Sequence, residues 1–549
     1  MSGAEPLVQA FLDDLAADDP VLAAGLGLRT GTGRLPSWSA AAVGSRLAMA
    51  ERHAERLRPL VAAADPATAV DAFAGLQIAR RLRRQYVLQG AHRRLPGAYL
   101  DQLFGVLPLL LREIGPPAER VDVLAGRLLA VPALLDEARE NLERGLPRVA
   151  VEVAVDQAQG LLELLGPTVR AFAAEAGRPG ALDRPSALAC AAVARFEDFL
   201  RDDLLPGASD ECAAGRDVIE DVLLWEHVLD EPPEDLAAYG REVLAASRAG
   251  MLEVARELGH DDVAGAVGVV LDHHPEAGGI VAAYEDAVLA AKRFVLDHDI
   301  VSLPREEELR VVPTPPFLRS LLPFAAYEPP GPYDARQLGH YFVTPPRDGL
   351  EGDALLEALY NHPYASMPTT GVHEAYPGHH LQLVSANGAP TLARRIAHVP
   401  NGGNILVEGW AFYCEELMER EGFLSDPAVR LMRLKDQAWR AARVVIDVEL
   451  HLGLMPFAEA VGFLAEAAHM NPADADAECR RYVLDPGQAM SYLLGRREVQ
   501  RLAGLYFASR TSTLREFHDE LLAWGSLPPA VIAWGMGLAP PPAAALLTR

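Results

Sequence analysis

Residues 371 to 382 read Gly-Val-His-Glu-Ala-Tyr-Pro-Gly-His-His-Leu-Gln and hold three histidines and a glutamate within eight positions. Two imidazoles on one helix face beside a glutamate are typical of zinc peptidases, in which the histidines bind the metal and the glutamate acts as general base. The usual spacing puts the second histidine four residues after the first, but that position is Pro377 here. The stretch therefore predicts a zinc site on an altered helix.

The second histidine ligand is His379 or His380, which follow His373 by six and seven residues. At about 1.5 Å per residue, an ideal helix separates such positions by roughly 9 to 10.5 Å. Two imidazoles share one metal across that span only if the helix bends, and a pair such as Pro377-Gly378 bends helices. We therefore predict a bend or bulge between the two histidine ligands.

The third ligand is predicted about thirty residues later, in Ile405-Leu406-Val407-Glu408-Gly409-Trp410-Ala411-Phe412-Tyr413. Glu408 is the single carboxylate of this apolar run, and a glutamate is almost never buried unless it is paired or bound to a metal. His-Glu pairs also occur by chance on surface helices that bind nothing, and Glu408 is the feature that favours zinc over that alternative. We predict His373, Glu408 and one later histidine as ligands, with Glu374 as general base.

Four strings, HEAYPGHHLQ, VEGWAFYCEEL, RAARVVIDVELHLG and DPGQAMSYLLGRREVQRL in that order, resemble the family called domain of unknown function 885 (DUF885). The resemblance covers most of residues 300 to 535 and is weaker before them. It implies a mostly α-helical, multi-helix fold related to neurolysin and angiotensin-converting enzyme, with a deep cleft and a small β-sheet near the active site. It also favours His379 as the second zinc ligand, with His380 as its support or as a substrate contact.

The same resemblance links residues far from the zinc motif to the reaction. Arg443, Asp447 and His451 follow one another at four-residue steps and so share one helix stripe, which is also the spacing of an ordinary surface salt-bridge stripe. The resemblance favours a functional role, in which Arg443 pairs with Asp447 and Asp447 orients His451. Tyr492 lies in another matching string, although a tyrosine on an apolar helix is usually a core residue. We expect Tyr492, and after it His451, to stabilise the oxyanion of the reaction.

The composition limits the classes of function. Lys plus Arg number 50 against 76 Asp plus Glu, and the resulting charge of −26 argues against nucleic-acid binding, because phosphate contacts need a basic face. The first 28 residues lack a basic segment before an apolar run, and no apolar run approaches the ~20 residues of a membrane helix. We expect a cytoplasmic protein with four free thiols and no membrane contact, and we leave open whether it forms a homo-oligomer.

The chain is expected to consist of an N-terminal helical region, 1–300, and a catalytic zinc-binding region, 301–549. Apolar residues recur every three to four positions through most of it, which predicts helices. The proline-rich segment 301–346 contains β-like pieces at Glu308–Val312 and Gly339–Val343, which suit edge strands beside the cleft or an ordinary linker. The predicted helices lie near 39–63, 67–89, 97–114, 117–144, 148–177, 186–203, 213–228, 233–258, 261–271, 278–298, 405–421, 427–453, 456–468, 473–483, 488–507 and 513–523.

These features predict a zinc-dependent peptidase that acts on short peptides, because a cleft roofed by helices excludes a globular substrate. The same metal chemistry would also hydrolyse a non-peptide amide. A protein of a different class, which binds a metal or a peptide without catalysis, would have no use for a base such as Glu374. A di-iron carboxylate centre normally needs paired Glu-x-x-His motifs, and the zinc motif provides none.

Overall fold

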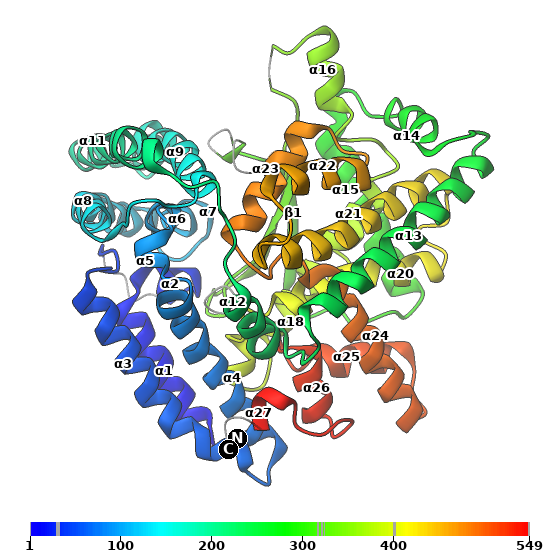
Figure 1. The fold of residues 1–549 in the computed structure, drawn as a ribbon, viewed down its shortest axis with the longest axis horizontal. Helices are drawn as coiled ribbons and strands as arrows, with labels where there is room; N and C mark the ends of the chain where they lie inside the picture. The colour runs from blue at the N-terminus through cyan, green and yellow to red at the C-terminus, as the bar shows by residue number, and fades with distance from the viewer. Residues whose placement is uncertain are drawn as a thin grey trace.

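The computed structural model describes residues 2–28, 33–315, 318–319, 322, 324–347, 349–398 and 402–546. Helices dominate it, and one small three-stranded sheet lies among them. Helices α1 to α11 gather on one side of the molecule, and α13 to α25 with the sheet form the other (Figure 1). In the part of the chain that is described, no helix is both long enough and apolar enough to cross a membrane.

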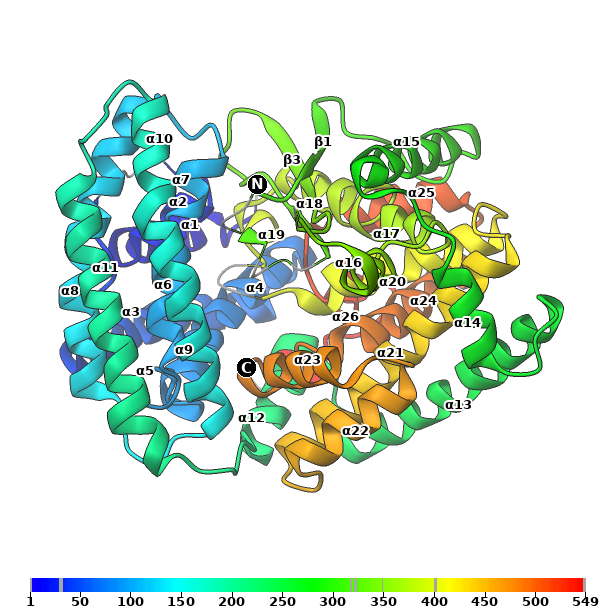
Figure 2. The same cartoon turned by 90° about the horizontal axis from the view of Figure 1, so that it is seen from above.

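The first side is a stack of helices, of which α2, α3 and α4 each begin at a side chain that accepts a hydrogen bond from a backbone N–H of the first turn. Asp65, for example, accepts a hydrogen bond from the backbone N–H of Thr68 at the start of α4, where Pro66 is the first helical residue. Seen from above, α8 and α11 lie at the outer edge of this stack, and α9 lies on the flank that faces the second side (Figure 2). The helices are α1 (Glu5–Asp18), α2 (Pro20–Gly25), α3 (Ala40–Leu57), α4 (Pro66–Arg83), α5 (Ala91–Arg94), α6 (Gly97–Phe104), α7 (Leu107–Leu111), α8 (Pro117–Asn141), α9 (Arg148–Glu163), α10 (Val169–Glu175) and α11 (Asp183–Phe199).

The second side is built on the long pair α13 and α21, which pack along each other. Their backbones are close, since a Cβ atom on Gly240 of α13 would lie 3.0 Å from the carbonyl oxygen of Ala441. The helices are α12 (Arg216–Asp221), α13 (Pro233–Glu257), α14 (Val263–Leu271), α15 (Ile280–Asp297), α16 (Gly352–Leu359), α17 (Met367–Glu374), α18 (His379–Asn387), α19 (Leu392–Arg395), α20 (Asn404–Arg420), α21 (Pro427–His451), α22 (Phe457–Ala467), α23 (Pro472–Leu484), α24 (Ser491–Ser509), α25 (Leu514–Leu522), α26 (Pro529–Gly535) and α27 (Ala543–Leu546).

The sheet consists of β1 (Glu307–Pro313), β2 (Ala325–Glu328) and β3 (Gln337–Val343), in the order β1-β3-β2. Strand β1 runs parallel to β3, with Glu307 opposite Gln337, and β2 runs antiparallel to β3, with Tyr327 opposite Tyr341. Helices α15 and α18 pack against β1. The sheet therefore lies next to the segment that carries the zinc motif.

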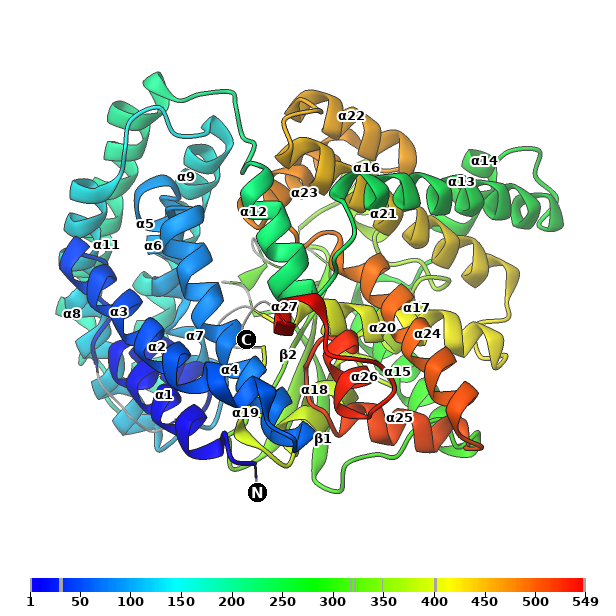
Figure 3. The same cartoon turned by 60° about the horizontal axis from the view of Figure 1, so that its bottom comes forward.

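The packing crosses the expected division at residue 300. One hydrophobic core holds buried residues from Ala4 to Ala545, and the second joins α13 to α21, α22 and α23. Near the C-terminus, α26 packs on α4 of the first side (Figure 3). The two sides thus share their cores, and the halves named from the sequence are not separate packing units.

The predicted elements agree with the structure where the apolar period is clear. Strands predicted at 308–312 and 339–343 are confirmed as β1 and β3, while the four-residue β2 was not predicted. The helix predicted over 148–177 is interrupted by a π-helical turn at Leu164–Thr168, where Gly166 leaves the helical conformation before Pro167. The helix predicted over 97–114 is likewise two helices, because α6 ends at Phe104 and α7 begins at Leu107.

Candidate metal centre

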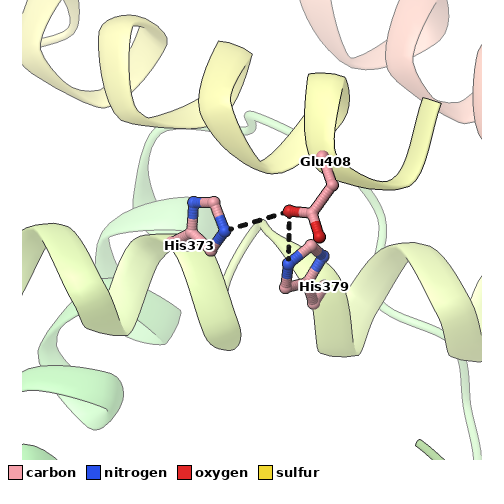
Figure 4. A group of neighbouring side chains, drawn as sticks. All are labelled: His373, His379 and Glu408. Atoms are coloured by element: carbon pink, nitrogen blue, oxygen red, sulfur yellow. Dashed lines mark ion pairs between the residues drawn. The ribbon is translucent and has the colours of Figure 1, made fainter. Parts of the chain in front are cut away.

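Three helices bring His373, His379 and Glu408 together at one point (Figure 4). His373 lies in the last turn of α17, His379 begins α18, and Glu408 lies in the second turn of α20. One potential ligand atom from each residue lies within 4.8 Å of the others. The Oε2 atom of Glu408 is 3.5 Å from Nε2 of His373 and 3.3 Å from Nε2 of His379. Among the described residues, this is the group whose donors fit a metal ion.

The expected distortion between the two histidines is confirmed, and it is a complete break. Helix α17 ends at Glu374, and α18 starts anew at His379. Gly378 turns back against α17, where its N–H donates to the carbonyl of Val372 at 3.0 Å. A Cβ atom on Gly378 would lie 1.9 Å from the carbonyl oxygen of His373, so only glycine fits this approach.

Helix α20 is held against this break and against α24. The indole Nε1 of Trp410 donates to the carbonyl of Pro377 at 2.7 Å. On the other side, Gly409 faces Gly495 of α24, and a Cβ atom on Gly495 would lie 2.0 Å from the carbonyl oxygen of Ile405. The glycine next to Glu408 therefore lets α24 approach the metal centre directly.

A buried glutamate that the sequence analysis missed supports the first histidine. Glu415 is 1 % exposed, and its Oε1 lies 2.8 Å from Nδ1 of His373. Because a carboxylate accepts only, Nδ1 carries a proton, and Nε2, the nitrogen that faces Glu408, is the one that can bind a metal. Glu415 follows Glu408 by seven residues, and that helical spacing was a usable signal.

The electrostatic interactions among His373, His379 and Glu408 favour a bound cation. Burial alone would raise the pKa of Glu408, but His379 and His373 hold it well below its usual value. Burial alone would lower the pKa of His373, but its contacts with Glu408 and Glu415 raise it to about 10. Oε2 of Glu408 is buried without a hydrogen-bond donor, and two imidazoles and a carboxylate are a common donor set for zinc. The residues therefore fit a zinc ion.

Glu374 and Tyr492 lie beside the three ligand candidates and are free to act on a substrate. The Glu374 carboxylate is partly exposed, and no described residue forms a hydrogen bond with it. The Tyr492 ring stacks on His373, with centroids 6.2 Å apart. Burial raises the pKa of Tyr492, with Glu408 as the next cause, so its hydroxyl keeps its proton. Within the described part of the chain, that hydroxyl also has no hydrogen-bond partner.

His380 points away from the centre and into a second polar network. Its Nε2 lies 2.8 Å from Oε2 of Glu307 on β1, and its Nδ1 lies 2.9 Å from the hydroxyl of Tyr327 on β2. Lys292 of α15 closes the network, with Nζ 2.6 Å from Oε1 of Glu307. Glu307 and Tyr327 were not singled out in the sequence, because strands far from the motif supply them. The geometry thus leaves His379 as the later histidine that faces Glu408.

The residues expected to interact with one another along α21, Arg443, Asp447 and His451, have other main partners in the structure. Asp447 accepts hydrogen bonds from the backbone N–H groups of Gly487 and Met490, at 3.0 and 3.1 Å. Its carboxylate lies 3.5 Å from Nε2 of His451, but that nitrogen lies 3.0 Å from the carbonyl of Tyr482. Burial lowers the pKa of His451 to about 4.

His451 is also bonded on its other side. The backbone N–H of Ala214 donates to Nδ1 of His451 at 3.2 Å, and the ring is fully buried. Both nitrogens are therefore occupied by backbone groups, and we leave His451 out of the proposed catalytic residues. Arg443 does not pair with Asp447 as expected, but binds Glu478 of α23 at 2.9 Å.

The sequence model of a family described as a bacterial protein of unknown function, DUF885, matches residues 20–536. The chain is a member of the DUF885 family. The match extends the resemblance from the zinc motif to nearly the whole chain. No curated protein matches this DUF885 protein.

Two solved structures share the fold of this DUF885 protein. One is described as "a putative lipoprotein of unknown function" from Shewanella oneidensis; it has a TM-score of 0.79 and 22% identity, over 97% of this chain and 99% of that chain. The other is a "putative lipoprotein" from Colwellia psychrerythraea, with a TM-score of 0.75 and 18% identity, over 98% and 99% of the two chains. Identities this low establish a common fold and nothing more.

The two relatives overturn the cytoplasmic localisation that the sequence led us to expect. Both carry the description of lipoproteins, which are proteins that lipid chains attach to a membrane. The expectation rested on the first 28 residues, the absence of a long apolar run and the four scattered cysteines. The descriptions of these two proteins contradict the expectation, and the cytoplasmic localisation is withdrawn.

Proposed function

We propose that this DUF885 protein is a zinc-dependent peptidase that hydrolyses peptide bonds of short peptides. The observation that carries the proposal is the convergence of two imidazoles and one carboxylate within 4.8 Å, beside a glutamate with an unpaired carboxylate. His373, His379 and Glu408 would hold the ion. When bound, zinc would polarise the scissile carbonyl and lower the pKa of the attacking water. We also propose that the helical fold is related to those of neurolysin and angiotensin-converting enzyme.

The protein's own residues supply the proton transfers and the positioning. Glu374 takes the proton of the attacking water and passes it to the leaving amine, a role that suits a carboxylate with no other partner. Tyr492 donates its hydroxyl proton in a hydrogen bond to the oxygen on which charge develops, and acts mainly in the transition state. Glu415 keeps the proton of His373 on Nδ1, so that Nε2 stays available.

Replacement of the base separates this proposal from a metal-binding protein without catalysis. Glu374→Gln keeps the size of the side chain but cannot accept a proton at neutral pH, so zinc should stay while turnover falls by at least ~10²-fold. The assay is digestion of a mixed peptide library, read by mass spectrometry, together with metal analysis of both proteins. Glu351→Gln, at the exposed residue before α16, is the matched control. A zinc-loaded wild-type protein that cleaves no peptide would refute the proposal.

A further inference from the structure

Positive charge surrounds the ring of Tyr492. The guanidinium carbon of Arg443 lies 4.6 Å from the centroid of that ring, and the carbon of Arg440 lies 5.8 Å from it. His373 also stacks on this ring, at 6.2 Å between centroids. Tyr492 therefore contacts both the arginine group and His373 of the candidate metal centre.

Two arginines of this group share one carboxylate, and while burial raises the pKa of Asp485, Arg481 acts to lower it. Arg443 and Arg481 both donate to the same oxygen, Oε2 of Glu478, at 2.9 and 3.0 Å, while Arg440 has Asp436 at 3.4 Å. Two guanidinium groups thus face one carboxylate. Arg443 is 4 % exposed, and its Nη1 atom is buried without a hydrogen-bond partner among the described residues. Arg443 is thus compensated only in part by the shared Glu478, and an anionic ligand beside the pair would offset the remaining cost of its burial.

One of the two guanidinium groups is accessible from outside. The side chain of Arg481 is 42 % exposed, although Gln488 also accepts a hydrogen bond from its Nη1 at 2.8 Å. Gln488 in turn lines a cavity of about 510 Å³ between the two sides of the molecule, together with Asp101 and Arg84. Arg481 does not itself line this cavity, and a ligand can reach it through the exposed part of its side chain.

We propose that Arg481, with Arg443 behind it, forms a subsite for the free α-carboxylate of a peptide substrate. The inference rests on the proposed peptidase function and adds where the peptide is cut. A guanidinium presents N–H donors in a fork that matches a carboxylate. An extended chain spans about 3.3 to 3.6 Å per residue, so a carboxylate bound by the arginine group next to Tyr492 lies a few residues from the scissile bond. The protein would therefore release short fragments from the carboxyl terminus.

The first test changes the substrate and leaves the protein as it is. A synthetic heptapeptide with uncharged side chains is compared with the same peptide whose carboxyl terminus is an amide. Hydrogen bonds to a charged group predict that the amide lowers kcat/KM by about 10- to 100-fold. Equal kcat/KM for acid and amide would overturn the subsite. An amidated peptide with a terminal glutamate tests the other source of a carboxylate, and full activity of that peptide would overturn the assignment to the α-carboxylate.

The second test assigns the preference to Arg481. Arg481→Gln should raise KM for the free acid about tenfold and remove most of the difference between acid and amide, while Arg481→Lys should keep part of it. A loss of stability alone would lower activity on both peptides equally and leave their ratio unchanged. Arg178→Gln is the matched control, because Arg178 is also 42 % exposed and pairs with a carboxylate at 3.0 Å. An unchanged ratio in Arg481→Gln would refute the role of this residue.

A binding measurement keeps the two proposals distinguishable. Zinc-loaded Glu374→Gln protein is titrated with the same two heptapeptides in a calorimeter, so that no turnover is needed. Failure of the wild type to cleave either peptide, together with tighter binding of the free acid, would refute the peptidase and support the subsite. Cleavage with no preference for the acid in rate or binding would support the peptidase and refute the subsite. Absence of binding by either peptide would refute the subsite as well.

Discussion

A single methyl group at Gly378 should weaken the metal centre. A Cβ atom there would lie 1.9 Å from the carbonyl oxygen of His373 and 2.3 Å from that of Val372, whereas non-bonded carbon and oxygen atoms stay about 3.3 Å apart. Gly378→Ala must therefore move α18, which begins at His379, away from α17 by more than about 1 Å. Metal ligands tolerate shifts of only about 0.2 Å. We expect zinc affinity to fall at least ~10-fold, the lower end of the cost of disturbing the support of a ligand.

The assay for Gly378→Ala is a competitive titration of zinc against a chelator, with circular dichroism to verify the fold. Gly388→Ala is the control, because Gly388 ends the same helix and its added Cβ would meet only the carbonyl oxygen of Ser385, at 3.4 Å. The control should keep the zinc affinity of the wild type. If Gly378→Ala binds zinc within twofold of the wild type while its fold is intact, the close approach does not set the geometry of the ligands.

Three further predictions address neighbouring parts of the account. Tyr492→Phe should lower kcat by about 10²- to 10³-fold, roughly 3 to 4 kcal/mol, because the hydroxyl acts in the transition state. Zinc content should stay unchanged, and steady-state kinetics with metal analysis measure both. An unchanged kcat would show that the tyrosine is a packing residue. Glu415→Gln should weaken zinc binding about 10- to 100-fold, because the carboxylate of Glu415 orients His373. The same chelator titration measures the affinity. An unchanged affinity would contradict this role of Glu415. Burial alone would raise the pKa of Glu226, but Arg81 and Arg84 lower it to about 2. The stabilisation from Glu226 should therefore be complete above pH ~4.5 and be lost as pH falls towards 2. The difference in unfolding free energy between wild type and Glu226→Gln should accordingly shrink by about 1.5 kcal/mol from pH 5 to pH 3. A difference that is constant over this range, measured by urea unfolding, would contradict the lowered pKa.

Much of the fold could be predicted from local sequence signals. Helix α21 was predicted at 427–453 and lies at 427–451, because Asp426 and Pro427 mark its start and its apolar residues keep one period. The ligand candidates were found in the same way, since histidines and a lone carboxylate in apolar surroundings are conspicuous. The break between α17 and α18 was foreseen only as a bend. How completely the helix is interrupted depends on the contact of Gly378 with α17, which no residue spacing encodes.

The partners of the site residues could not be predicted, because distant segments supply them. Spacing along α21 suggested that Arg443 pairs with Asp447, four residues on. In the fold, the carboxylate of Asp447 instead accepts two backbone N–H groups from the turn before α24, and Arg443 turns to Glu478. Hydrogen bonds from backbone groups that would otherwise be buried unpaired compete with a pair on the helix surface. His380 likewise finds Glu307 on a strand seventy-three residues away.

Zinc content per chain tests the central claim most directly. Wild-type protein, His379→Ala and His380→Ala are purified without chelator, loaded with zinc, dialysed and measured by mass spectrometry of the metal. Because His379 faces Glu408 and His380 faces Glu307, the wild type and His380→Ala should each retain about one zinc per chain, and His379→Ala should lose it. Full zinc in His379→Ala, or a wild-type protein that binds none, would contradict the account.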